Sequence, residues 1–115
     1  MKIIVPFKPL SINQMYCGDH IKTSLCRKFD KEMDKICKPF KNVMQAEWYT
    51  LEYRFYLKTF ERADNDNAIK GIQDGLVRNG VLIDDRRIKR FTAEKFKSEM
   101  DYVEVDIFPY VGVVE

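Results

Sequence analysis

Five aspartates gather around a short helical pattern that carries Lys70, in the segment RADNDNAIKGIQDGLVRNGVLIDDRRIKRF, which runs from Arg62 to Phe91. Asp64 and Asp66 are two residues apart, so in an extended segment both carboxylates leave the same face, with Cα atoms about 6.6 Å apart. Lys70 follows Asp66 by four residues and faces the same way one helical turn later. The spacing would let one cation contact both carboxylates while the lysine offers a positive charge to a phosphate.

A third carboxylate is expected to return to this pair along the chain. The pattern predicts a helix from Asn67, with Asp66 as its N-cap and Gly80 just beyond its end. That helix climbs about 20 Å, and an extended segment from Gly80 returns about 16 Å, which brings Asp85 near Asp64 and Asp66. Three carboxylates and a lysine suit phosphodiester hydrolysis. Oxygen ligands favour Mg²⁺, with Mn²⁺ as a substitute, and the cation can activate water and neutralise charge on the scissile phosphate.

Each of these residues also has an ordinary structural explanation. In that alternative Asp64 and Asp66 are turn and N-cap residues, and the pair Asp84–Asp85 closes a loop. Lys70 then forms an ion pair with Asp66 or with Asp74. The chemistry of the residues leaves both interpretations open.

The segment DNDNAIKGIQDGLVRNGVLIDD resembles the signature of the RusA-type Holliday-junction resolvases: Asp-x-Asp-Asn, a Lys four beyond the second Asp, Asp-small-Leu, then a Gly and Asp-Asp. The opening VPFKPLSINQMY is also similar to the start of that family. The resemblance implies a small α/β homodimer that binds four-way junction DNA and makes paired, Mg²⁺-dependent nicks. It further implies that Asp64, Asp66 and Asp85 are the essential acidic residues and Lys70 the essential lysine.

Two other functions compete with a resolvase. One is a module that binds branched DNA without cutting it, which the complete set of three aspartates and a lysine argues against. The other is an unrelated Mg²⁺-dependent RNase or phosphatase, which the residues do not exclude.

The chain departs from the family at Gly71 and Gly75, where other members often have Ala, and this bears on helix stability.

Basic and polar residues near the aspartates are the candidate DNA contacts. Four cations in five residues follow Asp85 directly, and such a cluster suits the phosphate backbone. The alternative is a solvated edge strand protected by its charges. The complete predicted set is Lys8, Asn13, Arg62, Asn67, Arg86, Arg87, Lys89 and Arg90.

Composition places the chain among ordinary globular proteins. Its 115 residues are 45% hydrophobic and 33% charged, and we expect one domain over residues 1–115. Three cysteines without a CxxC spacing do not indicate a disulfide framework or a zinc site, and the single His20 argues against His-dependent nucleases. We expect no membrane span, no nucleotide cofactor and a cytoplasmic protein; a bacterial or phage-infected cell is implied by the resemblance alone.

The expected fold is α/β or α+β, with a mixed sheet of about four strands and two helices in the order β-α-β-α-β-β. Residues 2–5 predict a strand, 8–16 a loop, 49–57 a long half-buried strand, and 91–95 and 103–107 the last strands. The first helix should begin after Thr23 or Ser24 and stop at Pro39, with Leu25, Phe29, Met33, Ile36 and Cys37 on its apolar face.

Symmetry predicts the assembly. A four-way junction needs two nicks related by a two-fold axis, while one chain offers one carboxylate cluster. We therefore expect a two-fold homodimer whose two sites open onto one shared basic face. We expect the apolar segments Tyr102–Phe108 and Val111–Val114 to form strands with an edge available for this dimer.

Overall fold

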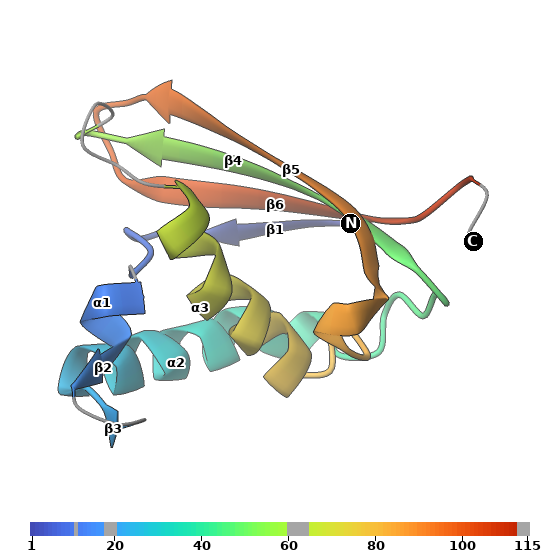
Figure 1. The fold of residues 1–115 in the computed structure, drawn as a ribbon, viewed down its shortest axis with the longest axis horizontal. Helices are drawn as coiled ribbons and strands as arrows, with labels where there is room; N and C mark the ends of the chain where they lie inside the picture. Colours follow the sequence, from blue (N-terminus) through green and yellow to red (C-terminus); the bar gives the residue numbers. More distant parts are fainter. Residues whose placement is uncertain (11, 18–20, 60–64, 113–115) are drawn as a thin grey trace.

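Two long helices cover one face of a four-stranded mixed sheet in the computed structural model (Figure 1). The structure describes residues 1–10, 12–17, 21–59 and 65–112, and side chains throughout these ranges except at positions 12, 13, 16, 17 and 65–67. The strand order is β1-β6-β4-β5, with β4 parallel to β5 and the other pairs antiparallel. The strands are β1 (Lys2–Val5), β4 (Tyr49–Leu57), β5 (Ile88–Lys97) and β6 (Tyr102–Pro109), and the long helices are α2 (Ser24–Cys37) and α3 (Asn65–Arg78). The predicted fold class and element types are confirmed.

Helix α1 (Ile12–Met15) and the start of β2 (Tyr16–Cys17) lie in the region expected to be a loop, residues 8–16. β2 pairs antiparallel with β3 (Ile21–Lys22), which follows that region. Met15 is buried, and its carbonyl accepts a 2.9 Å hydrogen bond from the Thr23 amide. Such brief elements depend on tertiary contacts rather than on local propensity, which explains why the sequence pattern did not predict them.

Strand β4 alternates strictly between buried and partly exposed residues, as its period of two predicts. Tyr49, Leu51, Tyr53, Phe55 and Leu57 all face the helices and are at most 3% exposed. The opposite face is polar: Arg54 pairs with Asp106 and lies 3.8 Å from carboxylate oxygens of both Glu52 and Glu104. The hydrophobic core therefore lies between this sheet and the two helices.

Helix α2 begins and ends where predicted, but its buried face differs from the prediction: Cys26 replaces Leu25, and Ile36 is only partly buried. Thr23 is the N-cap, because its Oγ1 accepts a 3.1 Å hydrogen bond from the Cys26 amide, and the helix stops at Cys37, before Pro39. The buried residues are Cys26, Phe29, Met33 and Cys37. Leu25, expected in the core, is 48% exposed, because the rotation of the helix turns Cys26 inward in its place.

Helix α3 starts two residues earlier than expected, at Asn65. Asp66 therefore lies in the first turn rather than at the N-cap, a position where a carboxylate still favours the positive end of the helix dipole. The glycines that depart from the family face α2: a Cβ at Gly71 would lie 3.3 Å from Phe29 Cε1, and one at Gly75 would lie 3.1 Å from Met33 Cε. Both positions allow a close approach of α2 and α3.

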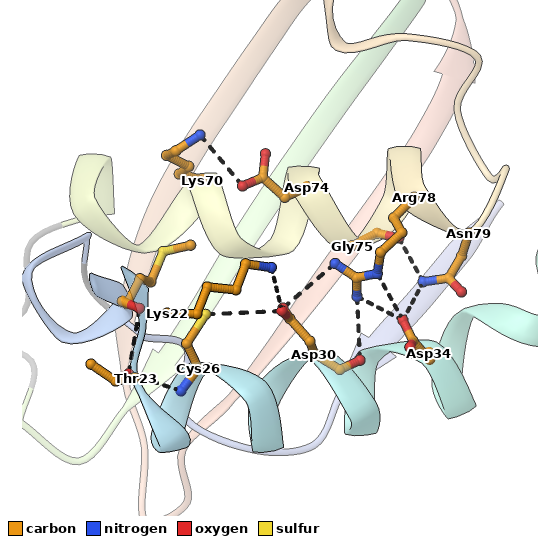
Figure 2. Close-up of polar contacts among 11 residues, drawn as sticks. Lys22, Thr23, Cys26, Asp30, Asp34, Lys70, Asp74, Gly75, Arg78 and Asn79 are labelled. Carbon is orange, nitrogen blue, oxygen red and sulfur yellow. Dashed lines mark hydrogen bonds and ion pairs between the residues drawn. The ribbon is translucent and has the colours of Figure 1, made fainter. Parts of the chain in front are cut away.

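A cluster of ion pairs holds the same two helices together (Figure 2). Arg78 of α3 places its Nη2 2.6 Å from Asp34 Oδ1 and its Nη1 3.5 Å from Asp30 Oδ1. Asn79 donates a 2.9 Å hydrogen bond to the same Asp34 oxygen, and Lys22 pairs with Asp30 at 2.7 Å. The contact between α2 and α3 thus combines close packing at the glycines with ionic contacts at the exposed rim.

The end of the chain departs from the expectation. Val111 is 92% exposed and belongs to no strand, and residues 113–115 lie outside the described part of the structure. No helix within the described ranges is long and apolar enough to cross a membrane.

Candidate active site

The predicted catalytic residues that the structure describes, Asp66, Lys70 and Asp85, lie on the unit formed by β4, α3 and β5. The chain leaves β4 at Leu57, enters α3 at Asn65, and returns through the 3₁₀ helix η3 (Asp85–Arg87) to begin β5. Asp64 and Arg62 lie outside the described residues, as do the side chains of Asp66 and Asn67. That Asp64 and Asp66 present their carboxylates on one face therefore stays a prediction.

Lys70 is exposed on α3, one turn after Asp66, as its spacing predicted. Its Nζ lies 3.4 Å from Asp74 Oδ2, an i,i+4 ion pair (Figure 2). This pairing is the one considered in the structural alternative. The contact is weak, because both side chains keep more than a third of their surface exposed, so Lys70 remains available to a phosphate.

Asp85 is exposed and lies beside the second half of α3. It lines an open hollow together with Lys22, Asp74, Val77 and Arg78. About 12 Å of helix separates Asp74 from Asp66.

The return path from α3 is shorter than an extended segment would be. The amides of Val81 and Leu82 both donate to the Leu76 carbonyl, at 2.9 and 3.3 Å, and both side chains are buried. The chain therefore folds under the end of α3 instead of running back along it. The extended path assumed from the sequence is wrong for these residues, while the metal-binding role of Asp85 stays a prediction.

Asp84 has the structural role that the alternative gave it. Its Oδ1 accepts a 2.9 Å hydrogen bond from the Arg86 amide, which caps η3, and its Oδ2 lies 2.9 Å from Arg86 Nη2. The Arg86 side chain and amide hold the pKa of the Asp84 carboxyl well below its usual range. Both carboxylate oxygens of Asp84 therefore interact with Arg86.

Asp74 is a residue that the sequence analysis did not include among the site residues. It shares one hollow with Asp85 and contacts Lys70. Its spacing of four residues from Lys70 was the available signal. Among the described residues no group of three or more His, Cys, Asp or Glu side chains is placed to hold a metal ion.

The candidate DNA contacts are dispersed over the surface. Lys8 is exposed beside an apolar hollow that includes Phe7 and Leu25, while Asn13 lies in α1, which packs against α3. The cations after Asp85 lie on η3 and at the start of β5, which is an edge strand of the sheet. Both the DNA-binding interpretation and the charged-edge alternative are compatible with that position.

Comparison with known families decides between the competing functions. The family model described as Endodeoxyribonuclease RusA matches residues 21–108, well over half of the chain. The chain belongs to the RusA endodeoxyribonuclease family. A search of curated proteins found no matching sequence. The RusA match includes the whole Asp-rich segment, β4, β5 and β6 as far as Phe108, whereas the opening motif that resembles the family's start lies before it.

This RusA protein is a hydrolase that resolves Holliday junctions in recombination and repair. The family is metal-dependent and acts on branched DNA. The residues of the Asp-rich segment fit a hard divalent cation, because they offer carboxylate oxygens and neither thiolate nor imidazole. When bound, such a cation neutralises charge on the phosphate that is cut.

Proposed function

We propose that this RusA protein cuts four-way junctions with Mg²⁺, using Asp64, Asp66 and Asp85 as metal ligands and Lys70 as a positive charge beside the scissile phosphate. The observation that carries the proposal is the exposed Lys70, which lies one helical turn from Asp66 within the segment that the family model matches. Mn²⁺ should substitute for Mg²⁺, because it accepts the same oxygen ligands.

Lys70 contributes by position and charge. An ammonium group at the start of α3 attracts the phosphate and stabilises negative charge that develops on its oxygens. Asp74 holds the side chain in reach at 3.4 Å without burying it. The first turn of α3 adds the positive end of the helix dipole on the same side.

The proposed assembly is a two-fold homodimer in the cytosol, with one site in each protomer. Two nicks of like polarity require two carboxylate clusters, and a two-fold axis relates the two strands. The uncovered edge of β5 and the basic residues at its start support a shared DNA-binding face. Sedimentation at micromolar concentration tests this: a monomer that still makes coordinated nicks would refute the dimer.

The decisive experiment is cleavage of a labelled four-way junction, a matched duplex and a hairpin RNA, each with and without Mg²⁺. We expect Mg²⁺-dependent cutting of the junction in preference to the others. Asp64→Asn, Asp66→Asn and Asp85→Asn should each abolish cleavage and leave junction binding intact or tighter, since a lost carboxylate removes both a ligand and a repulsion.

Glu94→Gln is the matched control, because it removes one exposed carboxylate from β5, and it should cut normally. Asp85→Asn is the most informative of the three aspartate variants, because Asp85 lies two turns along α3 from Asp66. Normal cutting by that variant alone would remove Asp85 from the ligand set while leaving the nuclease proposal standing. Preferential, Mg²⁺-dependent cutting of the RNA would refute the junction as substrate.

A further inference from the structure

The four cations that follow Asp85 lie in three different environments in the structure. Arg86 is bound to Asp84 through Nε at 3.2 Å and Nη2 at 2.9 Å. Arg90 is the strand partner of Thr50, on the face of the sheet away from the helices. Arg87 and Lys89 instead converge on Trp48: Arg87 Cζ lies 5.6 Å and Lys89 Nζ 5.9 Å from the centre of its ring.

An irregularity in the sheet produces this convergence. In the parallel pair of β4 and β5, Tyr49 is the partner of Ile88 and Thr50 is the partner of Arg90, so Lys89 is an extra residue in the ladder. A bulge of this kind redirects the side chain of the extra residue. Because Trp48 directly precedes β4 and Arg87 directly precedes β5, the bulge brings both cations to one ring.

The backbone beneath the ring is firmly held. The Trp48 carbonyl accepts a 2.9 Å hydrogen bond from the Tyr110 amide. Tyr49 is fully buried, and its hydroxyl donates to the Met44 carbonyl at 3.2 Å and accepts from the Ala46 amide at 3.3 Å. The backbone that carries Trp48 is therefore held in place on both sides of the sheet entry, by Tyr110 and by the buried Tyr49.

Among the residues that the structure describes, neither Arg87 nor Lys89 takes part in an ion pair. Arg87 Nη1 donates to the Glu47 carbonyl at 3.4 Å, and Glu47 also lines the same hollow as Arg87. An aromatic ring attracts two cations through its quadrupole but does not neutralise them. Two exposed like charges held near one ring attract an anion, and a DNA phosphate has the required charge.

We propose that Arg87 and Lys89 form a phosphate clamp for the DNA backbone and that Trp48 is its positioning residue. The proposal rests on the proposed function, because it takes the ligand to be the DNA that this enzyme cuts. It separates Arg87 and Lys89, which bind backbone phosphates, from Arg86, which donates hydrogen bonds to Asp84, the N-cap of η3.

The test measures binding of a fluorescein-labelled four-way junction in EDTA, so that no strand is cut, at several salt concentrations. Arg87→Ala combined with Lys89→Ala should reduce the log–log salt slope by about two units, one for each phosphate contact. Trp48→Leu should weaken binding about three-fold, and Trp48→Phe should restore most of that loss. Lys31→Ala, the matched control, removes one exposed cation of α2 that is not among the candidate DNA contacts, and it should change the slope by less than about half a unit.

Two readouts distinguish positioning from other roles. When Arg87→Ala and Lys89→Ala are already present, Trp48→Leu should not weaken junction binding further. If Trp48→Leu weakens binding equally in that double variant and in the unmodified protein, the proposal is overturned. Trp48 is the single tryptophan of the chain, so its emission should change on junction binding and lose that response when both cations are removed. Unchanged emission on binding would also overturn the clamp.

Measuring cleavage by the unmodified enzyme distinguishes a failure of the clamp from a failure of the proposed function. If the enzyme cuts junctions while Trp48→Leu binds them normally, the clamp alone fails. If it cuts no junction but Trp48→Leu still weakens DNA binding, the proposed reaction fails and the clamp stands. Thermal unfolding of each variant, with Trp48→Phe as the mildest change, shows that losses do not come from misfolding.

Discussion

Gly75 of α3 lies against Met33 of α2 so closely that an added Cβ would stand 3.1 Å from Met33 Cε and 3.3 Å from Met33 Cβ. The first of these atoms is the end of a flexible side chain, but the second is attached directly to the α2 backbone. Met33 is fully buried, so it has little space into which to move. The two helices are therefore in contact through the missing side chain of a glycine.

Gly75→Ala should destabilise the protein although alanine favours helices. Overpacking a core costs about 1–3 kcal/mol, which outweighs a gain of about 1 kcal/mol in helix propensity. Gly71→Ala is the comparison, because its added Cβ meets mainly Phe29 Cε1, at 3.3 Å. We expect it to be nearly neutral in urea unfolding. Greater stability of Gly75→Ala than of the unmodified protein would show that α2 can move aside.

Because of Asp34, the free energy of unfolding should decrease at acid pH. Burial alone would raise the pKa of its carboxyl, but hydrogen bonds from Asn79 and Arg78 outweigh burial and lower that pKa. A depressed pKa gives stability that is fully present above the ordinary value, 3.8, and is lost as pH falls through the folded value. Asp34→Asn should cost about 0.5–1 kcal/mol at neutral pH, the range of partly exposed pairs, and weaken the loss of stability below pH 4. If the free energy of unfolding falls equally below pH 4 in Asp34→Asn and in the unmodified protein, Asp34 does not have this role.

Lys70→Ala should lower the turnover of junction cleavage about 100-fold while weakening junction binding much less, because its proposed effect is on charge in the transition state. Single-turnover rates and binding in EDTA separate the two quantities. Equal losses of binding and turnover in Lys70→Ala would make Lys70 a phosphate anchor instead.

Asp74→Asn should change the free energy of unfolding by less than about 0.5 kcal/mol, since its pair with Lys70 is exposed.

Cys26 and Cys37 should resist alkylation while the protein is folded. Both are fully buried, and burial raises the pKa of the Cys37 thiol to about 11, so little reactive thiolate exists at pH 8. The measurement is iodoacetamide labelling followed by mass spectrometry in a Cys17→Ser background, with the same reaction in urea as the control. Labelling at equal rates in both conditions would contradict the described burial.

Local signals in the sequence were sufficient for the long elements. The period of two in β4 and the Thr23 cap of α2 each depend on neighbouring residues, and both are confirmed. The rotation that buries Cys26 instead of Leu25 depends on how α2 meets the sheet. Both residues are apolar, so their pattern in the sequence could not distinguish them.

In the candidate site too, local contacts could be predicted from the sequence and sequence-distant contacts could not. The i,i+4 spacing of Lys70 and Asp74 was visible, and their ion pair was one of the alternatives considered. The contact of Trp48 with Arg87 was not visible, because it joins segments about 40 residues apart through a parallel pair of strands and a bulge. Sequence-distant pairing of this kind leaves no periodic pattern.

The position of β6 between β1 and β4 has a consequence for the order of folding. β6 is the last strand of the described chain, yet in this sheet it is the neighbour through which β1 is joined to the rest. The unit of β4, α3 and β5 can form from nearby segments, whereas β1 must wait until Tyr102–Pro109 has docked on β4. Pairings so distant in sequence slow folding, so the edge formed by β1 is completed last, even though β1 is the first strand of the chain.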